Sequence, residues 1–235
     1  MIAVIPARGS SKGLPRKNLR PLAGTPLVVH TIRAAQASRL LRDFVVSTDD
    51  DEIAAAARAA GAPVPFVRPA ELARDETTAW PVVRHAIDDW EGRNGQHAEA
   101  AVLLQPTSPL RTGADIDDCI DRFRALKADI AATATRAHDS PHFNMLEVTP
   151  DSAPFARACS PLMLKHLRRQ EAPPVYALNG AVFVVRREVL AALDNQFTIE
   201  RFVVSEMPRE RSVDIDTADD LALAEWYLSR RAEGR

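Results

Sequence analysis

A short apolar run at the start of the chain leads directly into a loop rich in cations and glycine. Residues 2–6 read Ile-Ala-Val-Ile-Pro, and Ala7-Arg-Gly-Ser-Ser-Lys-Gly-Leu-Pro-Arg-Lys17 follows at once. Gly9 and Gly13 permit backbone geometries that other residues resist, so successive N–H groups could converge on an anion. The side chains that add positive charge are Arg8, Lys12, Arg16 and Lys17. The pattern predicts a phosphate-binding loop, although its spacing is neither Walker-like nor Gly-x-Gly-x-x-Gly; the alternative is a basic surface loop.

Near the other end of the chain, two aspartates stand two residues apart in Ser212-Val-Asp-Ile-Asp216. In an extended backbone, residues i and i+2 point to the same face, so Asp214 and Asp216 present their carboxylates side by side. Such a pair is costly unless it is compensated, and Mg²⁺ binds one or two carboxylates while keeping positions for water and phosphate oxygens. The pattern predicts a magnesium site. The alternative is a cap for the helix near Thr217, which would explain Asp216 but not Asp214.

Together, the two motifs indicate nucleotidyl transfer. The loop would hold a triphosphate, and Mg²⁺ on the two carboxylates would bridge it to an attacking hydroxyl. Catalysis would then depend on positioning and on the neutralisation of charge.

The composition favours an ordinary globular enzyme. The chain has 235 residues, 46% of them hydrophobic, and a net charge of −2, which gives no case for general nucleic-acid binding. No apolar stretch approaches the roughly 20 residues that span a bilayer, and the N-terminus lacks a signal-peptide pattern. Cys119 and Cys159 show no metal-ligand spacing. We therefore expect a cytoplasmic protein without membrane or nucleic-acid partners.

Apolar runs alternate with amphipathic stretches along the first 135 residues. The strands expected there are 2–6, 44–47, 65–67, 100–104 and 130–135, and the helices are 26–38, 50–60, 78–90 and 114–126. Farther along we expect strands at 181–185 and 202–205 and helices at 188–193 and 218–231. This alternation predicts an α/β fold with a doubly wound, mostly parallel, Rossmann-like sheet, whose ligands bind beyond the carboxyl ends of the strands.

Residues 137–174 break this pattern with six prolines and scattered apolar side chains. The segment is too apolar for a flexible linker, so it packs either on another subunit or as an irregular cover on its own domain. We predict an α/β nucleotidyltransferase domain made of 1–136 and 175–235, with 137–174 as a dimerisation or substrate-covering insertion.

The N-terminal motif Ile5-Pro-Ala-Arg-Gly-Ser-Ser-Lys-Gly-Leu-Pro-Arg-Lys-Asn-Leu19 resembles that of the acylneuraminate cytidylyltransferases. Five further motifs lie in the family's order and spacing. The first three are Val46-Ser-Thr-Asp49, Arg68-Pro-Ala-Glu-Leu-Ala73 and Leu104-Gln-Pro-Thr-Ser-Pro-Leu-Arg-Thr112. Asn179-Gly-Ala181 and Ser212-Val-Asp-Ile-Asp-Thr217 complete the set. The resemblance implies the nucleotide-diphospho-sugar transferase type of fold and runs nearly the whole length of the chain.

The resemblance implies transfer of CMP from CTP to the anomeric hydroxyl of a nonulosonic, sialic-acid-like 2-keto sugar acid, with release of pyrophosphate. Arg8 and Lys17 would contact the triphosphate, and Asp214 and Asp216 would bind Mg²⁺; these four are the expected catalytic residues. The nucleotide site would comprise Ala7, Arg8, Gly9, Ser11, Lys12, Lys17, Asn18, Arg68, Thr77 and Thr78. The sugar side would comprise Gln105, Arg169 and Asn179. The insertion matches the segment that family members exchange with a partner, which implies a homodimer.

Two departures from the family pattern bear on the substrate. Where relatives often have Asp-Thr-Ala-Ser-Ser near the cytosine, this chain has Asp75-Glu-Thr-Thr-Ala79. The basic residue that relatives often carry two positions before Asn-Gly-Ala is Ala177 here, which leaves Arg169 as a partner for the substrate carboxylate. The lost cation implies a different acid, such as legionaminic or pseudaminic acid.

Two alternatives stay open. The protein could be a transferase of the same fold that uses another nucleotide, such as GTP, or another acid, such as KDO. It could also be a non-catalytic nucleotide-binding protein, against which the intact Arg8, Lys17, Asp214 and Asp216 speak.

Overall fold

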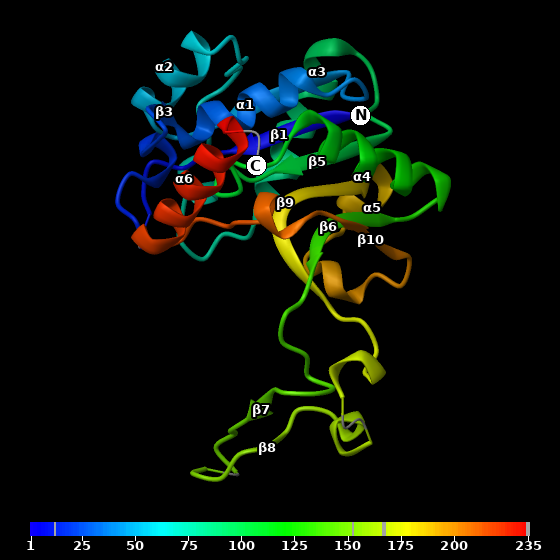
Figure 1. The fold of residues 1–235 in the computed structure, drawn as a ribbon. Coiled ribbons are helices and arrows are strands. Elements are labelled where there is room, and N and C mark those ends of the chain that lie inside the picture. The colour runs from blue at the N-terminus through cyan, green and yellow to red at the C-terminus, as the bar shows by residue number, and fades with distance from the viewer. Residues whose placement is uncertain (12, 152, 166–167, 234–235) are drawn as a thin grey trace. The chain divides into compact units, whose positions relative to one another are not determined.

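The computed structural model describes residues 1–11, 13–151, 153–165 and 168–233. Its chain forms two compact units, Met1–Ala134 with Leu178–Arg235, and Thr135–Ala177. The larger unit contains a six-stranded sheet with the order β10-β6-β9-β5-β1-β4 (Figure 1). These strands are β1 (Ile2–Pro6), β4 (Asp43–Ser47), β5 (Ala100–Leu104), β6 (Ile130–Arg136), β9 (Tyr176–Arg186) and β10 (Phe202–Glu206).

The sheet is mostly parallel. Strand β1 pairs in parallel with β4 and β5, and β10 pairs in parallel with β6, whereas β5 and β9 run antiparallel. The helices are α1 (Leu27–Ala37), α2 (Asp51–Ala59), α3 (Ala79–Asn94), α4 (Gly113–Ala125), α5 (Arg187–Leu190) and α6 (Ala218–Ala232). Within the described part of the chain, no helix combines the length and the apolar character needed to cross a bilayer.

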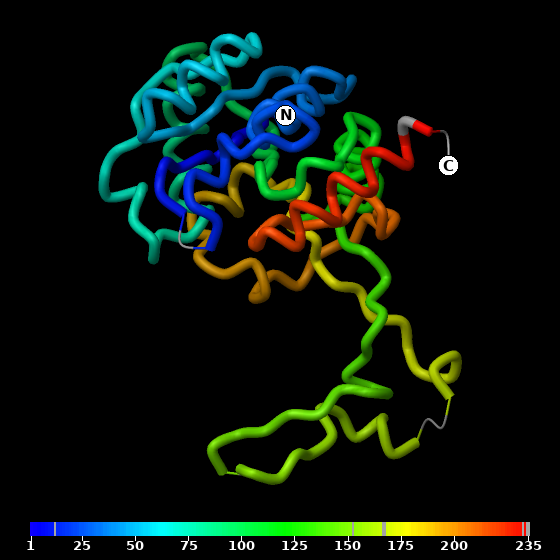
Figure 2. The backbone as a smooth tube through the Cα atoms, turned by 60° about the vertical axis from the view of Figure 1, so that its left-hand side comes forward, coloured from blue at the N-terminus to red at the C-terminus, as the bar shows by residue number. Residues whose placement is uncertain are grey.

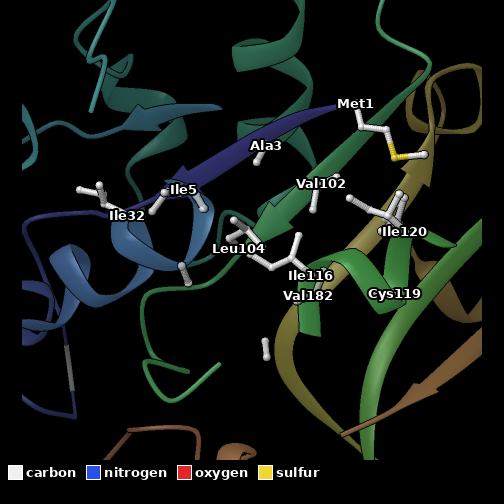
Figure 3. Close-up of a cluster of buried hydrophobic side chains, with 14 of the residues drawn as sticks. Met1, Ala3, Ile5, Ile32, Val102, Leu104, Ile116, Cys119, Ile120 and Val182 are labelled. Atoms are coloured by element: carbon white, nitrogen blue, oxygen red, sulfur yellow. The ribbon is translucent and has the colours of Figure 1, made fainter. Parts of the chain in front are cut away.

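Each face of the sheet buries its own apolar layer. Strand β1 sends Ala3 and Ile5 to a cluster shared with α1, α2 and α4, part of which is drawn in Figure 3. Its alternate residues Ile2 and Val4 join α3 and α5 on the other face. Because a fully buried aliphatic side chain contributes about 1.5–3 kcal/mol, both faces must be covered. The predicted doubly wound α/β architecture is confirmed.

A third apolar cluster joins segments that are far apart in the sequence. Its buried members are Leu14, Leu22, Leu27, Leu110, Val213, Ile215 and Ala224. Leu14 belongs to the basic loop, and Val213 and Ile215 alternate with the two aspartates. Figures 1 and 2 accordingly show the blue N-terminal segment beside the orange-red start of α6. A small hairpin, β2 (Pro21–Leu22) and β3 (Thr25–Pro26), contributes Leu22 to this cluster.

The smaller unit has little regular structure. Its two short strands, β7 (Leu146–Glu147) and β8 (Arg157–Ala158), form an antiparallel pair. Large apolar side chains are exposed there, among them Leu146 at 61%, Phe155 at 77% and Leu164 at 83%. The dimerisation role expected for 137–174 stays a prediction.

Several local expectations differ from the structure, and one of them is the end of α3, which lies at Asn94 instead of 90. Residues 65–67 form no strand, because Pro65 has no N–H to donate and Val67 exposes 73% of its surface. Strand β9 begins five residues before the expected 181, and α5 ends at Leu190 instead of 193. Beyond α5, Leu193 N donates to Leu190 O, so the backbone tightens into a turn.

A partly buried ion pair connects α4 to the segment just before the aspartates. Arg211 Nη2 lies 2.7 Å from Asp115 Oδ1, and the Asp115 side chain is only 3% exposed. Asp115 also forms a capping box with Thr112. Burial raises the pKa of the Asp115 carboxyl, but the hydrogen bonds from Arg211 and Thr112 outweigh it, so the net pKa lies below its ordinary value.

Replacing Asp115 by alanine is therefore expected to destabilise the protein by about 3 kcal/mol at pH 7, since it breaks the ion pair and removes the cap. The folded-state pKa is lowered, so this stabilisation is complete above the unfolded value of about 3.9 and fades as the pH falls through the folded value. Urea unfolding of the wild type and Asp115→Ala between pH 7 and pH 3 measures it. The exposed neighbour Asp118→Ala is the control, and an equal loss for both variants would contradict the argument.

Candidate functional site

A cavity of about 240 Å³ lies in the larger unit at the carboxyl ends of β1 and β5. Three segments line it. They are the loop after β1, the stretch from Arg68 to Val82 that leads into α3, and Gln105–Thr107 directly after β5. The cavity thus lies beyond the carboxyl ends of the strands, where the strand–helix alternation predicted that ligands bind.

The glycines of the basic loop serve close packing. A Cβ on Gly9 would lie 2.6 Å from Asp50 Oδ2, and a Cβ on Gly13 would lie 2.8 Å from the Asp216 carbonyl oxygen. Neither glycine has a left-handed φ, whereas Arg16 does, at 56°. Gly9 N donates to Asp49 Oδ1 at 3.1 Å, so this N–H is already used within the protein. The structure thus gives these glycines a packing role, and the anion-binding role of the loop stays a prediction.

The two cations expected to meet phosphate line the cavity, and each is paired with a carboxylate. Arg8 Nη1 lies 3.0 Å from Asp75 Oδ1, and Lys17 Nζ donates to Asp216 Oδ1 at 2.8 Å. The Lys17 pair joins residues 199 positions apart in the chain. Arg16 instead pairs with Asp50, the N-cap of α2, and with Glu52 in the first turn of that helix, outside the cavity lining.

Arg68 and Asn18 line the cavity and also form hydrogen bonds with the backbone around it. Arg68 is 5% exposed, and its guanidinium donates to the hydroxyl and carbonyl oxygens of Ser47 at the end of β4. Burial lowers the pKa of Arg68 to about 10, with the Asp49 charge opposing, so it stays charged at neutral pH. Asn18 Nδ2 donates to Arg8 O at 2.9 Å and so holds the backbone of the loop after β1 at Arg8.

The acidic pair is held by the strand-end loop that follows β5. Ile215 N donates to Thr107 O at 2.7 Å, which fixes the backbone between the two aspartates. Desolvation raises the pKa of the Asp214 carboxyl, and the neighbouring Asp216 charge raises it further, while a hydrogen bond from Thr107 and the Lys17 charge oppose. The Asp216 charge thus acts on the Asp214 carboxyl, while the side-by-side placement of the two carboxylates stays a prediction.

A buried polar network sets the shape of this loop. Arg111 donates to Ala181 O at 2.9 Å, to Thr31 Oγ1 at 3.0 Å and to the Gln105 carbonyl oxygen. Burial lowers the pKa of Arg111 to about 9. Because an unpaired buried guanidinium is very costly, these acceptors hold the Gln105 backbone in place.

Asn179 belongs to the same support. It is 4% exposed, its Oδ1 accepts from Thr133 Oγ1 at 2.7 Å, and its Nδ2 donates to Ser212 Oγ at 2.9 Å. Its amide therefore positions the start of the acidic segment instead of facing a ligand. The next residue, Gly180, has a φ of +68°, and a Cβ there would point at Asp214, Ser108 and Gln105 from 3.6–3.7 Å.

The donor set fits Mg²⁺. Among the described residues, no group of three or more His, Cys, Asp or Glu side chains could hold a metal. In the described part of the chain, a metal would therefore be held by fewer than three such side chains, and the predicted site is the Asp214 and Asp216 pair, whose mutual repulsion a cation would relieve. Mg²⁺ suits this set because it accepts two carboxylates and takes its other oxygens from water and phosphate.

The structure brings together most of the nucleotide residues expected from the sequence. Those that line the cavity are Arg8, Ser11, Lys17, Asn18, Arg68, Thr77, Thr78 and, from the sugar set, Gln105. Ala7 is fully buried and packs in the apolar core, so its side chain does not line the cavity. Arg169 belongs to the smaller unit, and its role toward the substrate carboxylate stays a prediction. Lys12 lies outside the described residues.

Several cavity residues were given no role from the sequence, although Asp75 begins the stretch that the resemblance placed near the cytosine. Arg74 and Asp75 line the cavity directly after the Arg68–Ala73 motif, and Val82 follows Thr78 by one helical turn. Thr78 is the N-cap of α3, yet its side chain makes no cap hydrogen bond, which leaves its hydroxyl for the cavity. Adjacency to a motif and helical spacing were the signals that could have found these residues.

Comparisons with known proteins agree with this geometry. A family model described as cytidylyltransferase matches residues 2–223. The chain is 32% identical to a CMP-N,N'-diacetyllegionaminic acid synthase of Campylobacter jejuni, over 97% of this chain and 95% of that protein. It is 33% identical to an N-acylneuraminate cytidylyltransferase of Streptococcus agalactiae over 93% of its own length, and it spans 51% of that relative.

A solved structure supports the fold. The CMP:2-keto-3-deoxy-manno-octonic acid synthetase complexed with CTP superposes with a TM-score of 0.71 at 18% identity, and the match covers 98% of both chains. At this low identity the structural likeness shows the fold alone, so the family assignment rests on the family model and the sequence relatives. The chain belongs to the cytidylyltransferase family of nucleotidyltransferases, as its resemblance to the acylneuraminate cytidylyltransferases predicted.

Proposed function

We propose that this protein transfers CMP from CTP to the anomeric hydroxyl of a nonulosonic sugar acid and releases pyrophosphate. The observation that carries the proposal is the contact of Lys17 Nζ with Asp216 Oδ1 at 2.8 Å. It joins a cation of the predicted phosphate loop to the predicted metal pair, so both halves of a nucleotidyl-transfer site meet beside one cavity. The names of the relatives from Campylobacter jejuni and Streptococcus agalactiae support a nine-carbon acid as the acceptor.

In this proposal, Arg8 and Lys17 bind the triphosphate and stabilise the charge that grows on the leaving pyrophosphate. The sugar hydroxyl attacks the α-phosphorus, a new P–O bond forms, and the bond to the bridging oxygen of the β-phosphate breaks. One carboxylate of the Asp214 and Asp216 pair takes the hydroxyl proton. When bound to these two carboxylates, Mg²⁺ would neutralise charge on the phosphate oxygens.

A screen of pyrophosphate release tests the substrate assignment. Purified protein with Mg²⁺ is mixed with each of the four NTPs and with N-acetylneuraminic acid, N,N'-diacetyllegionaminic acid or KDO. We expect the highest kcat/KM for CTP with a nine-carbon acid. A preference for GTP or for KDO would instead support the same-fold alternatives, and CTP binding without turnover on any acid would support a non-catalytic protein.

Two substitutions test the site. Arg8→Ala and Asp216→Asn are each expected to lower kcat/KM by about 100-fold, the scale on which one preorganised electrostatic group contributes. Arg93→Ala and Asp219→Asn remove the same types of charge away from the cavity and should retain wild-type activity. Full activity of Arg8→Ala and Asp216→Asn with the true substrate would show that the site is misassigned.

We also propose that the smaller unit mediates a homodimer. Exposed large apolar side chains support this, since Leu146, Phe155 and Leu164 each expose more than 60% of their surface. Burying such side chains against a second copy is favourable in proportion to the apolar area removed from water.

Sedimentation velocity at micromolar concentration tests the assembly. The wild type is expected to sediment as a dimer, and the double variant Phe155→Ser/Leu164→Ser as a monomer, because the hydroxyls weaken apolar burial. Leu126→Ser changes a side chain of the larger unit that is 55% exposed and should leave the dimer intact. A monomeric wild type would contradict the proposal.

A further inference from the structure

Arg8 is held by two residues, Arg74 and Asp75, to which the sequence analysis gave no role in the site. Its Nη1 donates to Arg74 O at 3.2 Å and lies 3.0 Å from Asp75 Oδ1. Both residues belong to the turn between Leu72 and the start of α3, and both line the cavity. The phosphate side of the cavity is thereby connected to the side that carries Thr77 and Thr78.

The contacts leave part of the guanidinium for a ligand. Both use Nη1, so in the described part of the chain they hold one edge of the planar fork. The Nε and Nη2 hydrogens remain on the other edges, in the geometry that suits a phosphate oxygen. A guanidinium fixed in this way loses less side-chain entropy when phosphate binds.

The Arg74 carbonyl links this anchor to the other wall. It accepts from Thr77 N at 3.2 Å as well as from Arg8 Nη1. Thr77 Oγ1 in turn donates to Glu71 O at 3.1 Å, which closes the turn on itself. The Arg74 carbonyl belongs to the peptide unit that leads into Asp75. A shift of Asp75 would therefore disturb both Arg8 and the cavity lining at Thr77.

We propose that Asp75 is a positioning residue of the nucleotide site, which orients Arg8 toward the phosphates of the bound triphosphate. This inference rests on the proposed function, because it takes a nucleoside triphosphate as the ligand. A negative charge beside a triphosphate would weaken binding by repulsion. The ion pair of Asp75 with Arg8 offsets this repulsion, since it orients a cation toward the phosphates.

Calorimetric binding of CTP in the presence of MgCl₂ to the full chain tests the inference. Asp75→Ala is expected to raise the Kd for CTP by about tenfold, within the range measured for neighbours in one network. Asp75→Asn, which keeps an oxygen acceptor for Arg8, should lose less. In the Arg8→Ala background, Asp75→Ala should cause no further loss, and this non-additivity is the signature that a merely structural role would not produce. The melting temperature of each variant should stay at the wild-type value.

The control is Glu52→Ala, which removes a carboxylate that pairs at 2.9 Å with Arg16 of the same loop outside the cavity lining. It should leave the Kd unchanged. Additive losses in the double variant would overturn the inference, as would tighter CTP binding by Asp75→Ala, which would make Asp75 a competitor for Arg8. If the wild type binds CTP and Asp75→Ala binds it equally, only this inference fails. If the wild type binds none of the four NTPs, the proposed function fails and the inference falls with it.

Discussion

A small cluster of buried apolar side chains holds the two halves of the site together. The ion pair between Lys17 and Asp216 cannot do so alone, because the Asp216 side chain is 71% exposed and such pairs contribute at most about 1 kcal/mol. Leu14, Leu110 and Ile215 bury their surfaces in a common cluster instead. Each fully buried aliphatic side chain contributes about 1.5–3 kcal/mol. Burial of these apolar side chains therefore brings the polar residues next to them in the sequence into contact.

The polar residues around the cavity also fall into two groups, those that shape the cavity and those that remain accessible to a ligand. Arg68, Arg111 and Asn179 are buried, and they form hydrogen bonds with residues of strands β4, β9 and β6, respectively. They shape the cavity, whereas Arg8 and Lys17 keep more surface for a ligand. Each of these two cations is paired with a carboxylate. In the proposed reaction, a triphosphate thus meets cations that are already oriented.

Much of the fold followed from periodicity, and the errors have local causes. The strands at 2–6 and 100–104 are apolar on both faces, which only a sheet covered on two sides requires. The segment 65–67 looked similar by composition, but Pro65 cannot join a ladder. The glycines of the loop were interpreted through conformational freedom, whereas their neighbours show close approach to Asp50 and Asp216. Such approaches depend on segments 40 and 200 residues away, which no local pattern reveals.

The sequence by itself determined the residue types, the alternating pattern of layers and the paired carboxylates, because these depend on spacing along one strand or one helix. It also determined the family, through motifs that keep their order. Only the tertiary structure decided which cations face the cavity. Arg16 and Lys17 are adjacent in the chain, yet one pairs with α2 and the other with Asp216. Only the fold showed that Asp75 anchors Arg8, because that contact joins two loops that the sheet brings to the same edge.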